Sequence, residues 1–112
     1  MPEPVSVSRS YTVPASSTKS FSAYDVPPAR VFVLKRVCIH FPVGTGNKLA
    51  VRVMHGIAQV VPEKGDVRGD DVERCFTCEQ RYESGSSVIV YAVNEDTSND
   101  LAFDITLEGE LE

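Results

Sequence analysis

Turn-forming residues interrupt this sequence about every 10 to 15 residues, and no segment between them repeats apolar residues at the helical spacing of three to four. The intervening runs are rich in Val, Ile, Thr, Tyr and Phe, which is the composition of β-strands. Parallel strands need long crossover connections, so short strands joined by short turns must pair mainly antiparallel. The pattern predicts an all-β chain.

Two runs give the clearest strand signals. Between Val5 and Val13 every even position is Ser or Thr, while the odd positions are mostly apolar, as expected for a strand with one wet face. The segment Val31–Phe41 is more apolar and is predicted to be the central buried strand. Lys35 is the exception on its predicted inner face, which otherwise contains Val31, Val33, Val37, Ile39 and Phe41.

A third run, Val88–Val93, is continuously apolar and predicts a strand buried on both faces. Weaker strand signals occupy residues 18–24, 49–54, 57–61, 73–82 and 101–107. About eight strands in one domain, residues 1–112, predict a small antiparallel two-sheet sandwich, with a jelly roll favoured over a small barrel. The spacing of the turns is similar to that of small viral-type jelly rolls, a resemblance of shape without a diagnostic motif.

Composition excludes several classes of function. The formal net charge is −5 with Lys and Arg scattered along the chain, whereas a nucleic-acid binder needs a basic face. No apolar stretch approaches the roughly 20 residues of a membrane helix. The first residues lack the pattern of a signal peptide, and three cysteines make a poor disulfide framework. We therefore expect no nucleic acid and no membrane as partners, and synthesis in the cytoplasm, with a virion as a further location.

Three cysteines and one histidine form the sharpest local pattern. Cys75 and Cys78 make a CxxC pair, while Cys38 and His40 are two apart and project from one face of a strand. Together they could supply four zinc ligands. Residues three apart on a regular strand point to opposite faces, however, so Cys75 and Cys78 converge only at a turn or bulge. We expect packed or half-buried thiols rather than zinc, with a Cys75–Cys78 disulfide, or one to Cys38, as less favoured alternatives.

Two acidic loops offer the carboxylates that Ca²⁺ prefers. One contributes Asp66, Asp70 and Asp71, and the other contributes Asp96 and Asp100. Neither loop has the twelve-residue spacing of an EF-hand. Solvated acidic loops are therefore the preferred interpretation, and no metal and no cofactor is predicted.

Two further patterns are weak. Arg68-Gly69-Asp70 matches a cell-adhesion tripeptide in the longest polar loop, but Gly-Asp pairs commonly form turns and a tripeptide carries little information. His40 and His55 lie on predicted strands with no nucleophile motif beside them, and neither GxSxG nor HExxH occurs. We predict no catalytic residues and a protein that is not an enzyme.

Two non-catalytic classes remain. The favoured one is a structural or assembly protein, most simply a virion-type component such as a capsid, decoration or spike module, acting through homo-oligomeric contacts. The alternative is a sandwich that binds carbohydrate or peptide with loops 62–72 and 94–100. The chain has no Trp, and most of its four Tyr and five Phe alternate with the apolar face, which disfavours sugar stacking.

Overall fold

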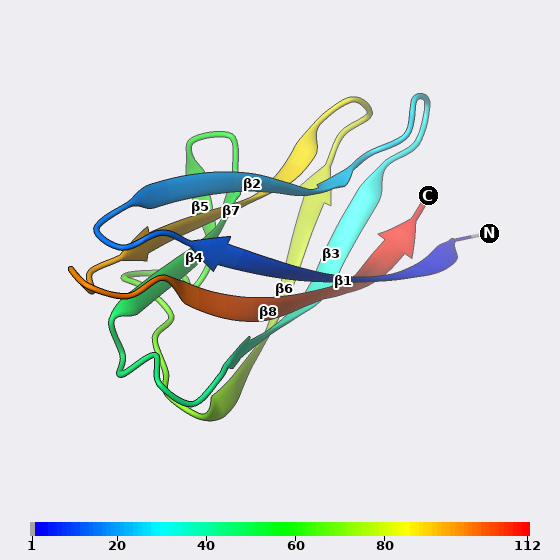
Figure 1. The fold of residues 1–112 in the computed structure, drawn as a ribbon. Coiled ribbons are helices and arrows are strands. Elements are labelled where there is room, and N and C mark those ends of the chain that lie inside the picture. Colours follow the sequence, from blue (N-terminus) through cyan, green and yellow to red (C-terminus); the bar gives the residue numbers. More distant parts are fainter. Residues whose placement is uncertain (1) are drawn as a thin grey trace.

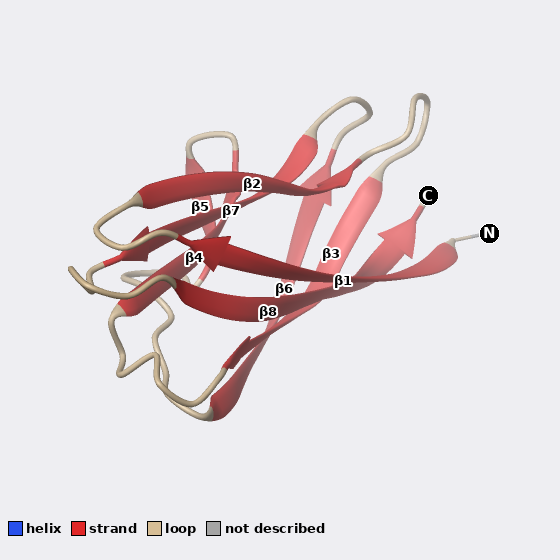
Figure 2. Cartoon of the chain, in the orientation of Figure 1, coloured by secondary structure: helices blue, strands red, loops and turns tan. Residues whose placement is uncertain are grey.

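Within residues 2–112, eight strands form two antiparallel sheets that pack face to face (Figure 1). The computed structural model describes residues 2–112, and within that range it contains no helix, so none could span a membrane (Figure 2). The strands are β1 (Glu3–Val13), β2 (Thr18–Asp25), β3 (Phe32–Phe41), β4 (Leu49–His55), β5 (Ala58–Val61), β6 (Val72–Tyr82), β7 (Ser87–Asn94) and β8 (Leu101–Leu111).

The strand order is that of a jelly roll. Sheet A has the order β1-β8-β3-β6, and sheet B has the order β2-β7-β4-β5. The first strand pairs with the eighth, the second with the seventh, the third with the sixth and the fourth with the fifth. One long hairpin rolled over on itself gives this pairing, and its two free ends lie at the same tip of the molecule (Figure 1). The predicted fold class is confirmed.

The core lies between the sheets and is built by alternation along each strand. Phe32 and Phe103 of sheet A, with Leu49 and Val90 of sheet B, are fully buried there. Tyr82 also points inward from β6, and its hydroxyl donates a hydrogen bond across the core to the Met54 carbonyl at 3.0 Å. Burial raises the pKa of Tyr82 well above its ordinary value, so the phenol stays a neutral donor.

The prediction of which β3 residues face the core is correct only for those after Lys35. A β-bulge between Leu34 and Arg36 shifts the register against both neighbouring strands and leaves Lys35 exposed. Before the bulge the core-facing residues are Phe32 and Leu34; after it they are Val37, Ile39 and Phe41. The expectation that Val31 and Val33 share the inner face with Val37 was wrong, because one extra residue reverses the alternation. Val33 is nevertheless buried, outside the cluster between the sheets.

The expectation that Val88–Val93 is buried on both faces was also wrong. Val88, Val90 and Ala92 are completely buried, whereas Ile89, Tyr91 and Val93 point to the outside of sheet B and are only half-buried. Both ladders of β7, to β2 and to β4, are occupied. The strand is thus central in its sheet, with one covered face and one open apolar face.

Gly109 of β8 provides a test of this packing. An added Cβ there would overlap the Val33 carbonyl oxygen and lie 2.9 Å from the Phe32 ring. We expect Gly109→Ala to lower the free energy of unfolding by about 1–3 kcal/mol, because backbone and ring must both shift. Urea unfolding measures this, with Ser8→Ala on the exposed face of β1 as the control, expected within about 0.5 kcal/mol of wild type. Equal losses for the two variants would contradict the packing described.

Candidate functional site

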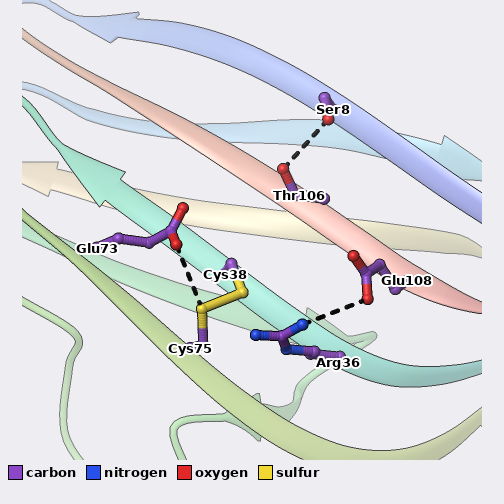
Figure 3. The surroundings of a disulfide bond; sticks show 7 residues. All are labelled: Ser8, Arg36, Cys38, Glu73, Cys75, Thr106 and Glu108. Atoms are coloured by element: carbon purple, nitrogen blue, oxygen red, sulfur yellow. Dashed lines mark hydrogen bonds and ion pairs between the residues drawn. A yellow bond between two sulfur atoms is a disulfide. The ribbon is translucent and has the colours of Figure 1, made fainter.

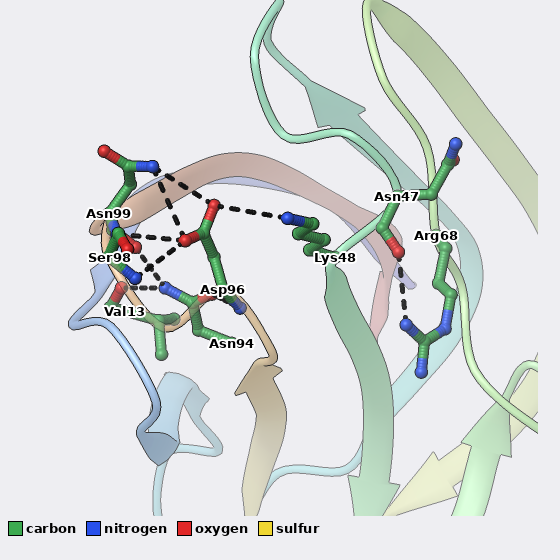
Figure 4. Close-up of polar contacts among 8 residues, drawn as sticks. All are labelled: Val13, Asn47, Lys48, Arg68, Asn94, Asp96, Ser98 and Asn99. Carbon is green, nitrogen blue, oxygen red and sulfur yellow. Dashed lines mark hydrogen bonds and ion pairs between the residues drawn. The ribbon is translucent and has the colours of Figure 1, made fainter.

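The two loops predicted to bind a ligand meet at one end of the sandwich. Arg68 of the loop between β5 and β6 makes a two-pronged ion pair with Glu95, with N–O distances of 2.5 and 3.1 Å. Its Nη1 also donates to the Asn47 carbonyl at 3.1 Å (Figure 4). The hydrogen bonds between the pair raise the pKa of Arg68 and lower that of Glu95. The ion pair braces the loops together.

The adhesion-like tripeptide is part of this brace. Arg68 is held by Glu95, and Gly69 is buried so tightly that a Cβ would lie 2.5 Å from a Val72 methyl carbon. Asp70 accepts a hydrogen bond from the Gly44 backbone N–H at 2.9 Å. All three residues are used in contacts within the chain, so the tripeptide has a structural role in this loop.

The carboxylates suggested for calcium do not come together. Asp66 pairs with Arg52 and lies 3.6 Å from Arg68, so its charge is balanced by two guanidinium groups. Asp100 accepts the Ala15 N–H at 3.0 Å. Of the remaining three, Asp70 and Asp96 accept hydrogen bonds from backbone N–H groups, and Asp71 is exposed. Within residues 2–112, the one group of at least three potential metal ligands lies elsewhere, on sheet A.

Asn94 is the buried centre of the loop end. Its amide donates to the carbonyls of Val13, at 3.0 Å, and Asn99, at 2.9 Å, while its carbonyl oxygen accepts the Asp96 N–H at 2.8 Å. Asp96 in turn accepts the Ser98 N–H at 2.8 Å (Figure 4). That hydrogen bond leads the causes that lower the pKa of Asp96, so the carboxylate stays ionised and stabilises the loop at neutral pH.

Removing the Asn94 side chain tests this network. We expect Asn94→Ala to lower the free energy of unfolding by about 2–3 kcal/mol, because a backbone N–H and two carbonyls lose partners at a buried site. Thermal or urea unfolding measures the loss, and Thr97→Ala in the same loop, at an exposed position, is the matched control. A small effect, equal to that of Thr97→Ala, would show that the network does not hold the loop.

The cysteines are arranged differently from the sequence prediction. Cys38 of β3 and Cys75 of β6 stand directly opposite each other and form a disulfide on the outer face of sheet A (Figure 3). Cys78 is a free thiol that points inward, where it contacts the Leu34 carbonyl and burial raises its pKa. The preferred expectation of packed or half-buried thiols holds for Cys78 and was wrong for Cys38 and Cys75, which form the less favoured disulfide to Cys38. The four zinc candidates with His40 do not converge. Strand pairing brings together two cysteines that are 37 residues apart, which no local pattern reveals.

The disulfide should stabilise the fold mainly by restricting the unfolded chain. Closing a loop of this size is worth about 3–4 kcal/mol in the chain-entropy account. We therefore expect Cys38→Ser to lower the free energy of unfolding by about that amount while the domain remains folded. Cys78→Ser, which keeps the disulfide, serves as control and should lose less. Unfolding of the two variants at the same urea concentration would contradict a stabilising role for the disulfide.

Neither histidine is arranged for nucleophilic catalysis. His40 lies 3.3 Å from the Asp104 carboxylate on the exposed outer face of sheet A, and Ser10 donates to the other oxygen of that carboxylate. The serine therefore binds the aspartate and not the imidazole, so no base activates it. His55 contacts Gln80 at 2.8 Å and packs against the Tyr82 ring.

The outer face of sheet B has half-buried apolar side chains at its centre. Its centre is the β7 row defined above, Ile89, Tyr91 and Val93, which we call the apolar row. Ser and Thr of β2 flank it on one side, and Ala50, Arg52 and Met54 of β4 flank it on the other. Arg52 lies over the Tyr91 ring at 6.0 Å. The continuous apolar run Val88–Val93 drew attention to this strand, but the run could not show which face of the strand is open to solvent.

The outer face of sheet A is, by comparison, polar and charged. Its rows pair Ser8 with Thr106, and Arg36 with Glu108 at 3.8 Å. Sheet A also has two long unpaired edges, β1 and β6, each of 11 residues. Beside β6 the sandwich opens into a groove of about 420 Å³ against β5, which includes Val60, Phe76 and Cys78 among its lining residues.

Comparison with known proteins identifies the fold but assigns the chain to no family. Neither family models nor curated protein sequences give a match. Among solved structures, the cyanophage Pam1 capsid asymmetric unit aligns with a TM-score of 0.59 at 9% identity, over 97% of this chain and 85% of that one. The capsid of Helicobacter pylori bacteriophage KHP30 aligns at 0.53 and 14%, over 97% and 93%. The disulfide-linked pili of Bacillus endospore appendages align at 0.52 and 13%, over 97% and 89%. At these identities the likeness concerns the fold alone.

Proposed function

We propose that the protein is a non-enzymatic structural subunit of a virion-type assembly, a capsid, decoration or spike module, which associates with further copies of itself. The observation that carries this proposal is the apolar row on the outer face of sheet B. Soluble sandwiches usually cover one face of each sheet with the core and place polar residues on the other. Sheet A follows that rule, and the centre of sheet B does not.

The composition of this face suits a subunit contact. Interface cores are enriched in aromatic residues and Arg and depleted in other charged groups. Here Tyr91 stands at the centre beside Arg52, whose charge is already balanced by Asp66, and the flanking β2 positions are Thr18, Ser20 and Ser22. Burying the exposed halves of these side chains would leave no unpaired charge at the centre of the face, while Asp25, at the end of the β2 row, accepts hydrogen bonds from Ser22 and Ser87.

Three other features support the proposal. The unpaired edges of β1 and β6 offer backbone groups to a neighbouring strand. The Cys38–Cys75 disulfide suits an oxidising location such as a virion surface. The solved structures that share the fold include bacteriophage capsids.

The alternative, ligand binding at loops 62–72 and 94–100, has less support. Arg68, Glu95, Asp70 and Asp96 make their hydrogen bonds within the chain, which leaves few convergent polar groups for a ligand. Among residues 2–112, every buried side-chain nitrogen or oxygen has a partner. These contacts favour a bracing role for the loops.

Light scattering on the purified full-length chain tests the proposal. Wild type is expected to form a symmetric homo-oligomer at micromolar concentration, and Tyr91→Glu is expected to shift it to monomer by placing a charge in the buried contact. Thr106→Glu, on the outer face of sheet A, is the matched control and should leave the oligomer intact. A monomeric wild type at high micromolar concentration, or an unchanged Tyr91→Glu oligomer, would contradict the proposal.

A further inference from the structure

The outer face of sheet A gathers metal-binding side chains around the disulfide. Cys38 and Cys75 are direct cross-strand partners, and Glu73 precedes Cys75 by two residues on the same face of β6 (Figure 3). The Cys75 sulfur lies 3.7 Å from a Glu73 carboxylate oxygen, and the ligand atoms of all three residues lie within 4.8 Å of one another. Glu73 and Cys75 are exposed and Cys38 is half-buried, so the group is open to solvent.

We propose that, once this disulfide is reduced, Cys38, Cys75 and Glu73 bind a zinc ion on the outer face of sheet A. The site goes beyond the proposed assembly function and does not depend on it. Two thiolates and one carboxylate are ligands that zinc takes in proteins, and a water molecule completes the tetrahedron. Soft thiolate sulfur selects zinc over magnesium or calcium, which prefer oxygen alone.

The chemistry of the step balances with a phosphine reductant and water. The S–S bond breaks, each sulfur takes one hydrogen, and the phosphorus takes the oxygen to become a phosphine oxide. When zinc binds, the two thiols release their protons and the sulfurs coordinate as thiolates. In the oxidised chain both sulfurs are bonded to each other, so the site cannot form.

The backbone beneath the site is held independently of the disulfide. β3 lies between β8 and β6, and its inner residues Val37 and Ile39, on either side of Cys38 in sequence, are completely buried. Cys38 therefore stands on a strand fixed by the core, and Cys75 and Glu73 stand on β6, which is paired with that strand at both positions. This arrangement limits the ordering cost of metal binding. This distinguishes the group from scattered surface carboxylates.

Cobalt titration of the full chain, reduced with phosphine and kept under anaerobic conditions, tests the proposal. We expect one Co²⁺ per chain, a thiolate-to-cobalt charge-transfer band, and displacement of the cobalt by Zn²⁺. The oxidised chain and Cys38→Ser should show no band, whereas Cys78→Ser should bind as wild type does. Absence of the band in reduced wild type, or its loss in Cys78→Ser with Cys38→Ser unaffected, would overturn the site.

Glu73→Gln tests the third ligand in a protein that keeps its disulfide until reduction. It should weaken cobalt affinity by about tenfold or more, since losing even an indirect partner of a metal site has that effect. Glu79→Gln, an exposed carboxylate of the same strand that pairs with Lys35, is the matched control and should leave affinity unchanged. Equal affinities for Glu73→Gln and wild type would remove Glu73 from the site. Circular dichroism of each reduced variant establishes that it is folded.

Discussion

The packing of two inner faces against each other sets the position of nearly everything else in this molecule. Each strand must turn alternate residues into the shared core, and the residues between them then face solvent. In β3 the core-facing residues change from even to odd positions at Lys35. A bulge there allows Phe32 and Leu34 as well as Val37 to reach the core. The same alternation places Cys38 and Cys75 outside and Cys78 inside.

Patterns along the chain predicted the fold class, the approximate strands and the positions of the loops at 62–72 and 94–100, because strand and turn preferences are local. The contacts that brace these loops were not predicted. Features that depend on how distant strands pair could not be predicted from these local patterns. The disulfide follows from the register of β3 against β6, and the open face of β7 follows from which side the second sheet covers. Lys35 was the one local sign of the bulge: a charged residue on an otherwise apolar face marks a change of register or of burial.

The surfaces left over after folding divide into three kinds. At the loop end, polar side chains make hydrogen bonds and ion pairs within the chain, through Asn94 and the Arg68–Glu95 pair. The outer face of sheet A is charged, and it contains the disulfide with Glu73 beside it. The outer face of sheet B is apolar at its centre, with the Arg52–Asp66 ion pair beside the apolar row and Asp25 at one end. A subunit that associates through sheet B, with sheet A exposed, uses each surface in keeping with its chemistry.

A cryo-electron microscopy reconstruction of the protein in its associated state would show which face lies between copies. We expect Ile89, Tyr91 and Val93 to lie buried between copies while the Cys38–Cys75 disulfide faces solvent. An assembly held by loops 62–72 and 94–100, with the apolar row exposed to water, would contradict this expectation.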